Sequence, residues 1–183
     1  MNQMKFTPLE AGIYSERRFV AFLNSFGIPF IKIYQDIESA SHYHKMNKHD
    51  VYSVKRPDFV VGIESMGCIA IDVKNYRTYQ DEDNPDAKYY KIATREITEL
   101  CNFGIVYKLP VWLAFDTPGS STVWNLYSLT QLQRTHWKED PSDYKIYIKD
   151  CVDVVDEVSF KNLQQLSYSS CEQIDTGNWV SCI

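Results

Sequence analysis

The spacing of apolar residues near the N-terminus predicts an amphipathic helix between Thr7 and Gly27. Threonine is a good helix cap, Pro8 fits the first helical position, and Glu10 completes a capping box. Gly27 is a common type of helix end. The face expected to point at a core has spacings of 4, 3, 4 and 3 residues and consists of Leu9, Ile13, Glu16, Val20 and Leu23. Glu16 is the one charged residue on that face.

Short apolar runs after this helix predict three strands, of which the last two form a hairpin. They cover residues 29–33, 56–61 and 68–74, and the turn of the hairpin is expected at residues 62–67. Side chains alternate along a strand, so Asp72 and Lys74 share one face. Between the first two strands, residues 34–55 are polar and rich in histidine and lysine, which predicts a long loop or flap.

The next pattern is helical, and two more strands follow it. Asn84 is the expected cap of this second helix, whose inner face consists of Tyr90, Ala93, Ile97, Leu100 and Gly104. A basic stripe on the same helix consists of Lys88, Lys91 and Arg95. Residues 109–115 and 122–127 are apolar and are predicted strands, with a Pro118-Gly119 turn between them. The order α-β-β-β-α-β-β predicts an α/β fold.

The last 56 residues carry weaker patterns. Residues 144–148 and 152–158 are predicted strands, and residues 129–137 are a predicted short helix. We expect residues 128–183 to form a C-terminal extension that packs, within the same domain, on a core formed by residues 1–127.

Composition limits the class of protein. A chain of 183 residues with 44% hydrophobic residues suits one domain with a real core and excludes global disorder. The sequence has no apolar run of about 18 residues and no apolar N-terminal stretch, which argues against a membrane span and a signal peptide. Five cysteines without a C-x-x-C spacing fit reduced thiols, not a zinc framework or a disulfide scaffold. We therefore expect a cytoplasmic protein that does not engage a membrane.

The net charge of −5 counts against nucleic-acid binding, because phosphate contacts need lysine and arginine. The excess charge is uneven. Residues 1–127 hold 14 basic and 15 acidic side chains, and residues 128–183 hold 5 and 9. The first two-thirds of the chain is therefore close to neutral, and a local basic face is compatible with it.

Two aspartates interrupt the otherwise apolar strands of the predicted hairpin. An ionised carboxylate in such a setting is costly unless it is paired or bound to a metal ion. If the strands pair, Asp58 and Asp72 approach and repel each other, and a hard divalent cation such as Mg²⁺ relieves the repulsion. Lys74 faces the same side and can orient or help to activate a water, or offset charge on a phosphate. Glu16, aimed at the sheet from the first helix, is a third carboxylate, which should either be paired or serve the same site.

The pattern Pro57-Asp58 followed by Asp72-Val73-Lys74, with Glu16 upstream on a helix, resembles the PD-(D/E)XK nuclease superfamily. The resemblance covers residues 7–127 and implies a restriction-endonuclease-like core, with a mixed central sheet flanked by helices. It also implies a site for Mg²⁺ or Mn²⁺ held by Asp58, Asp72 and the Val73 carbonyl, with Glu16 as the acid from the first helix. Lys74 would act with the attacking water. The sub-types that the chain resembles are the Holliday-junction-resolvase-like and the restriction-like nucleases, and the sequence does not choose between them.

The resemblance implies an endonuclease that hydrolyses phosphodiester bonds of duplex or branched DNA, and it makes a homodimer an expectation. The basic residues that are candidates for DNA contact are Lys45, Lys48, Lys55, Arg56, Arg77, Lys88, Lys91 and Arg95. Two alternatives stay open: a nuclease-like module without catalysis that binds nucleic acid or a protein, and a binding module of another fold. In structural terms, the alternative is an edge salt bridge between Asp72 and Lys74, with Asp58 capping a turn. His42, His44 and His49 have a spacing that can bind zinc, but solvent-exposed histidines are common in such a polar loop.

Overall fold

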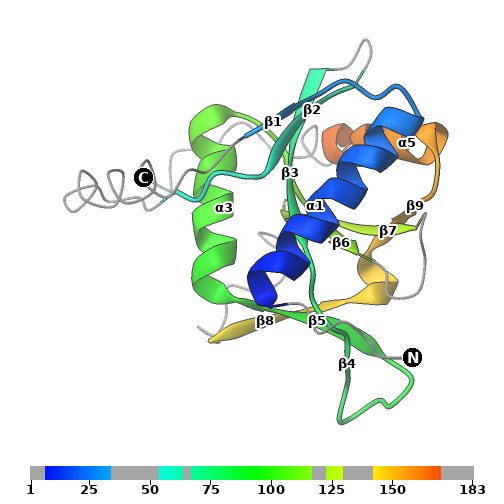
Figure 1. Ribbon diagram of the computed structural model, residues 1–183. Coiled ribbons are helices and arrows are strands. Elements are labelled where there is room, and N and C mark those ends of the chain that lie inside the picture. The colour runs from blue at the N-terminus through cyan, green and yellow to red at the C-terminus, as the bar shows by residue number, and fades with distance from the viewer. Residues whose placement is uncertain (1–6, 34–53, 64–66, 117–122, 130–141, 170–183) are drawn as a thin grey trace.

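The computed structural model describes residues 7–33, 54–63, 67–116, 123–129 and 142–169, with residues 164–169 described by their backbone alone. Figure 1 shows a large sheet and a smaller sheet with helices around them. The elements are, in chain order, α1 (Pro8–Ser25), β1 (Phe30–Lys32), β2 (Phe59–Ile63), β3 (Gly67–Lys74), β4 (Tyr79–Gln80), β5 (Lys88–Ala93), α3 (Thr94–Tyr107), β6 (Val111–Asp116), β7 (Trp124–Ser128), β8 (Asp143–Tyr147), a 3₁₀ helix (Ile148–Asp150), β9 (Val152–Val154) and α5 (Glu157–Ser169).

The larger sheet is mixed and has the strand order β1-β2-β3-β6-β7-β9. Strands β1, β2 and β3 are antiparallel neighbours, β3 and β6 run parallel, and β7 and β9 continue the sheet in antiparallel pairs. The parallel pair arises because the chain crosses over through α3 between β3 and β6. Every residue of β6 and β7 is buried, as expected for strands that are covered on both faces.

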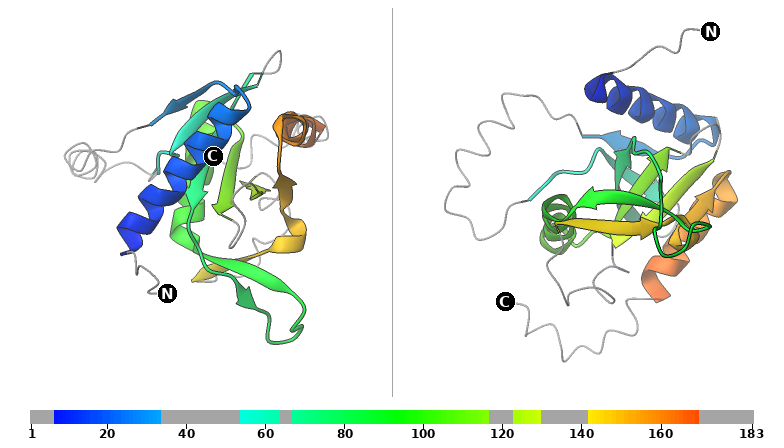
Figure 2. Two further views of the ribbon diagram at one scale, coloured as in Figure 1. Left: turned by 45° about the vertical axis from the view of Figure 1, so that its right-hand side comes forward. Right: turned by 90° about the horizontal axis from the view of Figure 1, so that it is seen from below.

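Helices α1 and α3 cover opposite faces of this sheet (Figure 2). On the α1 face, the ring of Phe19 lies 5.5 Å from that of Phe59 and 4.9 Å from that of Trp124, measured between centroids. On the α3 face, Tyr90 stacks on Phe115 at 3.9 Å. The predicted α/β fold with a mixed central sheet flanked by helices is confirmed. The core has the predicted order α-β-β-β-α-β-β, with β4 and β5 inserted before its second helix.

Helix α1 begins as predicted, and its buried face overlaps the predicted one in part. Thr7 and Glu10 form the capping box, and the Thr7 backbone N–H donates to Glu10 at 2.8 Å. The buried residues of the helix are Ser15, Phe19, Phe22 and Leu23. Leu9 and Ile13, by contrast, are 74% and 41% exposed. The prediction was right for Leu23, and Val20 packs partly against the core. It was wrong for Leu9 and Ile13, because the two phenylalanines bury more apolar area against the sheet than these aliphatic residues near the N-terminus would.

The predicted helix from Asn84 is wrong over its first part, because Lys88–Ala93 form strand β5. Tyr90 and Ile92 are buried while the residues between and beside them are exposed or half-buried, which is the period of a strand. Strand β5 pairs antiparallel with β4 and with β8, far downstream, to form the three-stranded sheet. Helix α3 begins at Thr94 directly after β5, without a connecting loop. In Figure 1 the three-stranded sheet therefore lies at the N-terminal end of α3.

Beyond residue 128 the chain adds to both sheets. Strand β8 lies close to the predicted strand 144–148, and β9 occupies the start of the predicted strand 152–158 at the edge of the central sheet. That second prediction was too long because Asp156 and Ser159 exchange hydrogen bonds at the start of α5. Phe160 and Leu163 of α5 enter the core on the α1 face. The division into residues 1–127 and 128–183 stays a prediction.

Several predictions fall outside the described residues. These include nearly all of the predicted helix 129–137 and most of the predicted loop 34–55, with His42, His44 and His49. Within the part of the chain that is described, no helix is long and apolar enough to cross a membrane.

Candidate functional site

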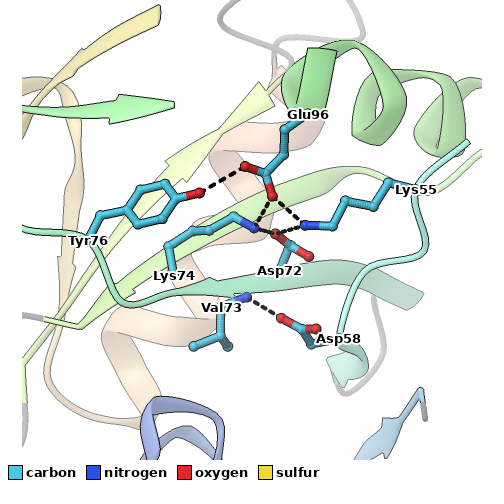
Figure 3. A network of polar contacts seen from close by, with 7 residues as sticks. All are labelled: Lys55, Asp58, Asp72, Val73, Lys74, Tyr76 and Glu96. Atoms are coloured by element: carbon cyan, nitrogen blue, oxygen red, sulfur yellow. Dashed lines mark hydrogen bonds and ion pairs between the residues drawn. The ribbon is translucent and has the colours of Figure 1, made fainter. Parts of the chain in front are cut away.

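Asp58 and Asp72 are cross-strand neighbours where β2 begins and β3 ends. The ladder pairs Phe59 with Ile71, so the next position places Asp58 opposite Asp72 on the same face. The Val73 backbone N–H donates to Asp58 Oδ2 at 2.7 Å, which fixes the Asp58 carboxylate against β3 (Figure 3). The antiparallel pairing that the sequence predicted therefore brings the two carboxylates together.

Asp72 is fully buried and is surrounded by cations. Its Oδ2 atom forms an ion pair with Lys74 Nζ and lies 3.3 Å from Lys55 Nζ. Its Oδ1 atom is buried and has no hydrogen-bond partner among the described residues. A buried carboxylate oxygen without a donor is energetically costly, so this atom is poised to accept a ligand.

The other buried aspartate of the same region differs from Asp72 in this respect. Asp116, at the end of β6, uses both carboxylate oxygens on helix α1: Arg18 pairs with Oδ1 and the Ser15 hydroxyl donates to Oδ2 at 2.9 Å. Asp116 is therefore a satisfied structural contact between α1 and the sheet. Of these two buried aspartates, Asp72 alone keeps an oxygen unused.

Glu96 joins the site from the first turn of α3, and sequence reasoning did not find it. One of its oxygens accepts from Lys55 at 2.5 Å and from Lys74 at 2.7 Å, and the other accepts from the Tyr76 hydroxyl at 2.9 Å (Figure 3). The helix start predicted at Asn84 placed Glu96 in the middle of a helix. The signal that could have located it is an acid in a first helical turn directly after a strand.

The charges of this network hold its groups in defined protonation states. Burial raises the pKa of Glu96, but Lys74 and Lys55 outweigh that effect and lower it to about 2. Burial likewise lowers the pKa of Lys74, but the charges of Asp72 and Glu96 outweigh it, so the pKa lies above its ordinary value. Lys74 is therefore a cation at neutral pH, and Glu96 beside it is ionised.

Asp58 is held in the opposite way. Burial, followed by the charge of Asp72, raises the pKa of the Asp58 carboxyl from 3.8 to about 7, although the Val73 N–H bond favours the ionised form. The charge of Glu16 adds to the rise. Asp58 and Asp72 thus carry more negative charge between them than the surrounding cations stabilise, which is the electrostatic condition for binding a further cation.

Glu16 is close enough to Asp58 for its charge to act on it, but its carboxylate forms an ion pair with another residue. Its carboxylate pairs with Lys32 on β1 at 2.8 Å, and about a quarter of the side chain is exposed. The charge of Glu16 therefore affects the pKa of Asp58, but the direct ion-pair partner of Glu16 is Lys32 and not a cation of the Asp58–Asp72 site.

The basic residues predicted for DNA contact are dispersed. Lys45 and Lys48 lie outside the described residues, and Lys55 belongs to the site itself. Arg56 is half-buried, and Arg77 is exposed over the ring of Tyr79.

The predicted basic stripe of Lys88, Lys91 and Arg95 does not exist as one helical face, because the first two residues lie on β5 and the third on α3. Lys91 pairs with Asp143 at 2.9 Å, and Arg95 pairs with Glu99 at 2.8 Å. The stripe was wrong because a strand and a helix present the same three residues in different directions.

The site fits a divalent cation with few protein ligands. Within the described residues, no three or more His, Cys, Asp or Glu side chains are grouped so as to hold a metal ion. Mg²⁺, however, commonly takes only one or two carboxylates and fills its shell with waters and phosphate oxygens. The unused Asp72 Oδ1 and the facing Asp58 carboxylate supply that minimal set.

Fold and site together define an α/β protein in which two facing carboxylates and a buried lysine meet where β2 begins and β3 ends. This is the arrangement that the resemblance to the PD-(D/E)XK superfamily implies. No family model matches the chain, and comparison with curated proteins finds no match.

Among solved structures, the chain is similar to Hjc, a Holliday junction resolvase from the archaeal hyperthermophile Archaeoglobus fulgidus. The likeness covers 82% of this chain and 96% of that one, at 17% identity and a TM-score of 0.49. A likeness at this level is a statement of similarity alone.

Proposed function

We propose that this chain is a divalent-metal-dependent endonuclease that hydrolyses phosphodiester bonds of DNA. The observation that carries the proposal is the buried Asp72 Oδ1, which has no hydrogen-bond partner among the described residues. Asp72 lies opposite Asp58 across the β2–β3 ladder, and Lys74 pairs with its other carboxylate oxygen. Oxygen ligands of this kind suit Mg²⁺ or Mn²⁺. Asp58, Asp72 and the Val73 carbonyl would bind the ion. Glu16 would be the acidic residue that α1 contributes to the site.

The bound ion would supply Lewis-acid polarisation of the phosphate and a water of lowered pKa. Lys74 pairs with Asp72 and Glu96, whose charges raise its pKa above the ordinary value of a lysine, so we assign it the role of a cation and not of a proton acceptor. It instead places a fixed positive charge where the phosphate gains negative charge, and it orients the attacking water by hydrogen bonding. Glu96 and Tyr76 position Lys74, since Glu96 contacts both side chains.

Lys55 gives the site a second cation. It bridges Asp72 and Glu96 from the segment that leads into β2. We propose that Lys55, its neighbour Arg56, and Arg77, which directly follows the site residue Tyr76, contact the phosphates of the DNA backbone. A homodimer stays a prediction.

The test compares the wild-type protein with Asp72→Asn on supercoiled, linear and branched DNA in Mg²⁺, in Mn²⁺ and in EDTA. Cleavage should require the metal ion and should be lost in Asp72→Asn. A matched control is Asp86→Asn, which makes the same chemical change on an exposed residue and should cleave normally. Absence of metal-dependent cleavage on every substrate would overturn the proposal, and so would full activity of Asp72→Asn.

One observation favours a second candidate function, a nuclease-like module without catalysis. Lys55 and Lys74 both pair with Asp72, so protein cations face its charge directly, as a purely structural salt-bridge network requires. The two candidates differ in metal binding. A catalytic site should raise the melting temperature when Mg²⁺ or Mn²⁺ is added, whereas a structural network should not respond.

A further inference from the structure

The three-stranded sheet carries a row of tyrosines on the face turned away from the core. Tyr79 pairs with Tyr89 across β4 and β5, and Tyr89 pairs with Tyr147 across β5 and β8. The ring centroids of these two pairs are 5.7 Å and 5.8 Å apart. The alternate residues Tyr90, Ile92 and Ile146 are buried on the opposite face. We call Tyr79, Tyr89 and Tyr147, all half-buried, the tyrosine row.

Each ring of the tyrosine row has a cationic side chain over it. The Arg77 guanidinium lies 4.9 Å from the centroid of Tyr79. The ammonium groups of Lys145 and Lys149 lie 4.8 Å from the centroid of Tyr89 and 5.5 Å from that of Tyr147. Arg77, Lys145 and Lys149 are exposed, so aromatic faces and positive charges alternate along one accessible surface.

Two acidic side chains on this face, Asp81 and Asp143, are engaged by residues of the same sheet. Asp81 accepts from the Tyr147 hydroxyl at 2.5 Å and pairs with Lys145 at 3.4 Å, and Asp143 pairs with Lys91 at 2.9 Å. Among the described residues, neither Arg77 nor Lys149 forms a salt bridge with a carboxylate. These two cations at the ends of the tyrosine row are therefore available to an anionic partner.

The tyrosine row begins next to the candidate active site. Tyr76 donates to Glu96 inside the site, and Arg77 and Tyr79 follow it within three residues. At the other side, β5 continues directly into α3, which carries Glu96 in its first turn. A polymer that lies along the row therefore passes close to the proposed cleavage centre.

We propose that the tyrosine row binds an unpaired DNA strand adjacent to the cleavage centre. Bases without a pairing partner expose faces that stack on aromatic side chains, and their phosphates suit the cations between the rings. A duplex offers its phosphates but not its base faces. The inference rests on the proposed function for the identity of the polymer, and it adds a substrate class: DNA with a single-stranded segment.

The test measures binding without cleavage. Fluorescence anisotropy with a labelled oligothymidylate of about 12 nucleotides, a length within the reach of single-strand-binding surfaces, is recorded in EDTA for each variant. Tyr89→Leu should weaken binding about tenfold, and Tyr89→Phe, which keeps the ring, should stay within about twofold of wild type. Tyr107→Leu is the matched control, because Tyr107 is 52% exposed at the far end of α3. No binding by the wild type, or equal losses in Tyr89→Leu and Tyr107→Leu, would overturn the inference.

A second variant leaves the rings in place. Arg77→Gln combined with Lys149→Gln changes two exposed side chains and should weaken binding of the oligothymidylate. It should also make the slope of log affinity against log salt shallower by about 1.4, because each lost phosphate contact to a single strand contributes about 0.7. An unchanged slope and affinity would overturn the inference even if Tyr89→Leu did not fold.

The same assay separates this inference from the proposed function. Asp72→Asn should bind the oligothymidylate like wild type while failing to cleave. If the wild type never cleaves DNA but Tyr89→Leu loses binding, the tyrosine row stands and the nuclease proposal falls. If the wild type cleaves DNA but Tyr89→Leu binds the oligothymidylate as tightly as the wild type does, the nuclease proposal stands and the inference about the tyrosine row is overturned.

Discussion

Replacing Asp58 with asparagine should stabilise the metal-free protein at alkaline pH. The Asp58 carboxyl has its pKa raised from 3.8 to about 7, mainly by burial and then by the charge of Asp72. A raised folded-state pKa means that the folded protein binds more protons than the unfolded chain between these two values. Stability therefore falls as pH rises from about 4 to about 7 and is level above that. Asparagine keeps an oxygen for the Val73 N–H and carries no charge.

The magnitude follows from the size of the shift. A rise of about three units corresponds to about 4 kcal/mol at 1.36 kcal/mol per unit. We expect about half of this, ~2 kcal/mol, because local relaxation and water entry reduce the cost of a buried charge. For a chain of this length, ~2 kcal/mol raises the melting temperature by roughly 4–8 °C. At pH 5 the gain should be less than half of its value at pH 8, because most of the titration window lies above pH 5.

Differential scanning fluorimetry of both proteins in EDTA at pH 5 and pH 8 measures this gain directly. Mg²⁺ at about ten times its dissociation constant should stabilise the wild type at pH 8 by about 1.4 kcal/mol and leave Asp58→Asn unchanged. DNA cleavage by the variant should be lost. The reasoning is refuted if Asp58→Asn is less stable than wild type at pH 8, or if its gain is the same at both pH values.

Three further substitutions test the remaining groups. Asp72→Asn should lower the free energy of unfolding, measured in urea, by about 2–4 kcal/mol, because it leaves the buried Lys74 with Glu96 as its one anionic partner. The sign is opposite to that expected for Asp58→Asn. A variant as stable as the wild type would contradict the proposed network. Lys74→Met should lower kcat about 10²–10³-fold on DNA that the wild type cleaves. Because Lys74 keeps its charge, the pH profile of the wild-type rate should show no titration of this lysine below about pH 10. A break in that profile near neutral pH that is assigned to Lys74 would refute its fixed charge. Glu96→Gln should lower kcat about tenfold with little change in KM, because it loosens Lys74 without touching substrate; a pure KM effect would show that Glu96 contacts DNA instead.

The hairpin and its acids could be predicted from the sequence because every signal for them is local. Two short apolar runs flank a turn, and the alternation of a strand then fixes the face of Asp72 and Lys74. The α1 capping box is local in the same sense, with Thr7 and Glu10 three residues apart. Strand periodicity and strand pairing were therefore enough to place Asp58 and Asp72 side by side.

The parts that the sequence did not reveal depend on distant partners. Residues 88–93 have a spacing that also suits a helix, and pairing with the short strand β4 and with β8, far downstream, makes them a strand. Because the prediction assigned these residues to a helix, it placed the helix start at Asn84 and did not identify Glu96 as a residue of the site. The predicted buried face of α1 did not include Phe19, because Phe19 is buried by its contacts with Phe59 and Trp124. Neither partner is visible within the helix itself.

The direct join between β5 and α3 has a consequence for how this protein can vary in length. Each residue inserted into a helix turns everything after it by about 100° and advances it by 1.5 Å. Because no loop separates Ala93 from Thr94, one added residue at this junction would swing Glu96 away from Lys74 or pull β5 out of register with β8. Homologous or engineered chains should therefore tolerate insertions between β4 and β5 while keeping the count of residues from the last β5–β8 pair to Glu96 unchanged.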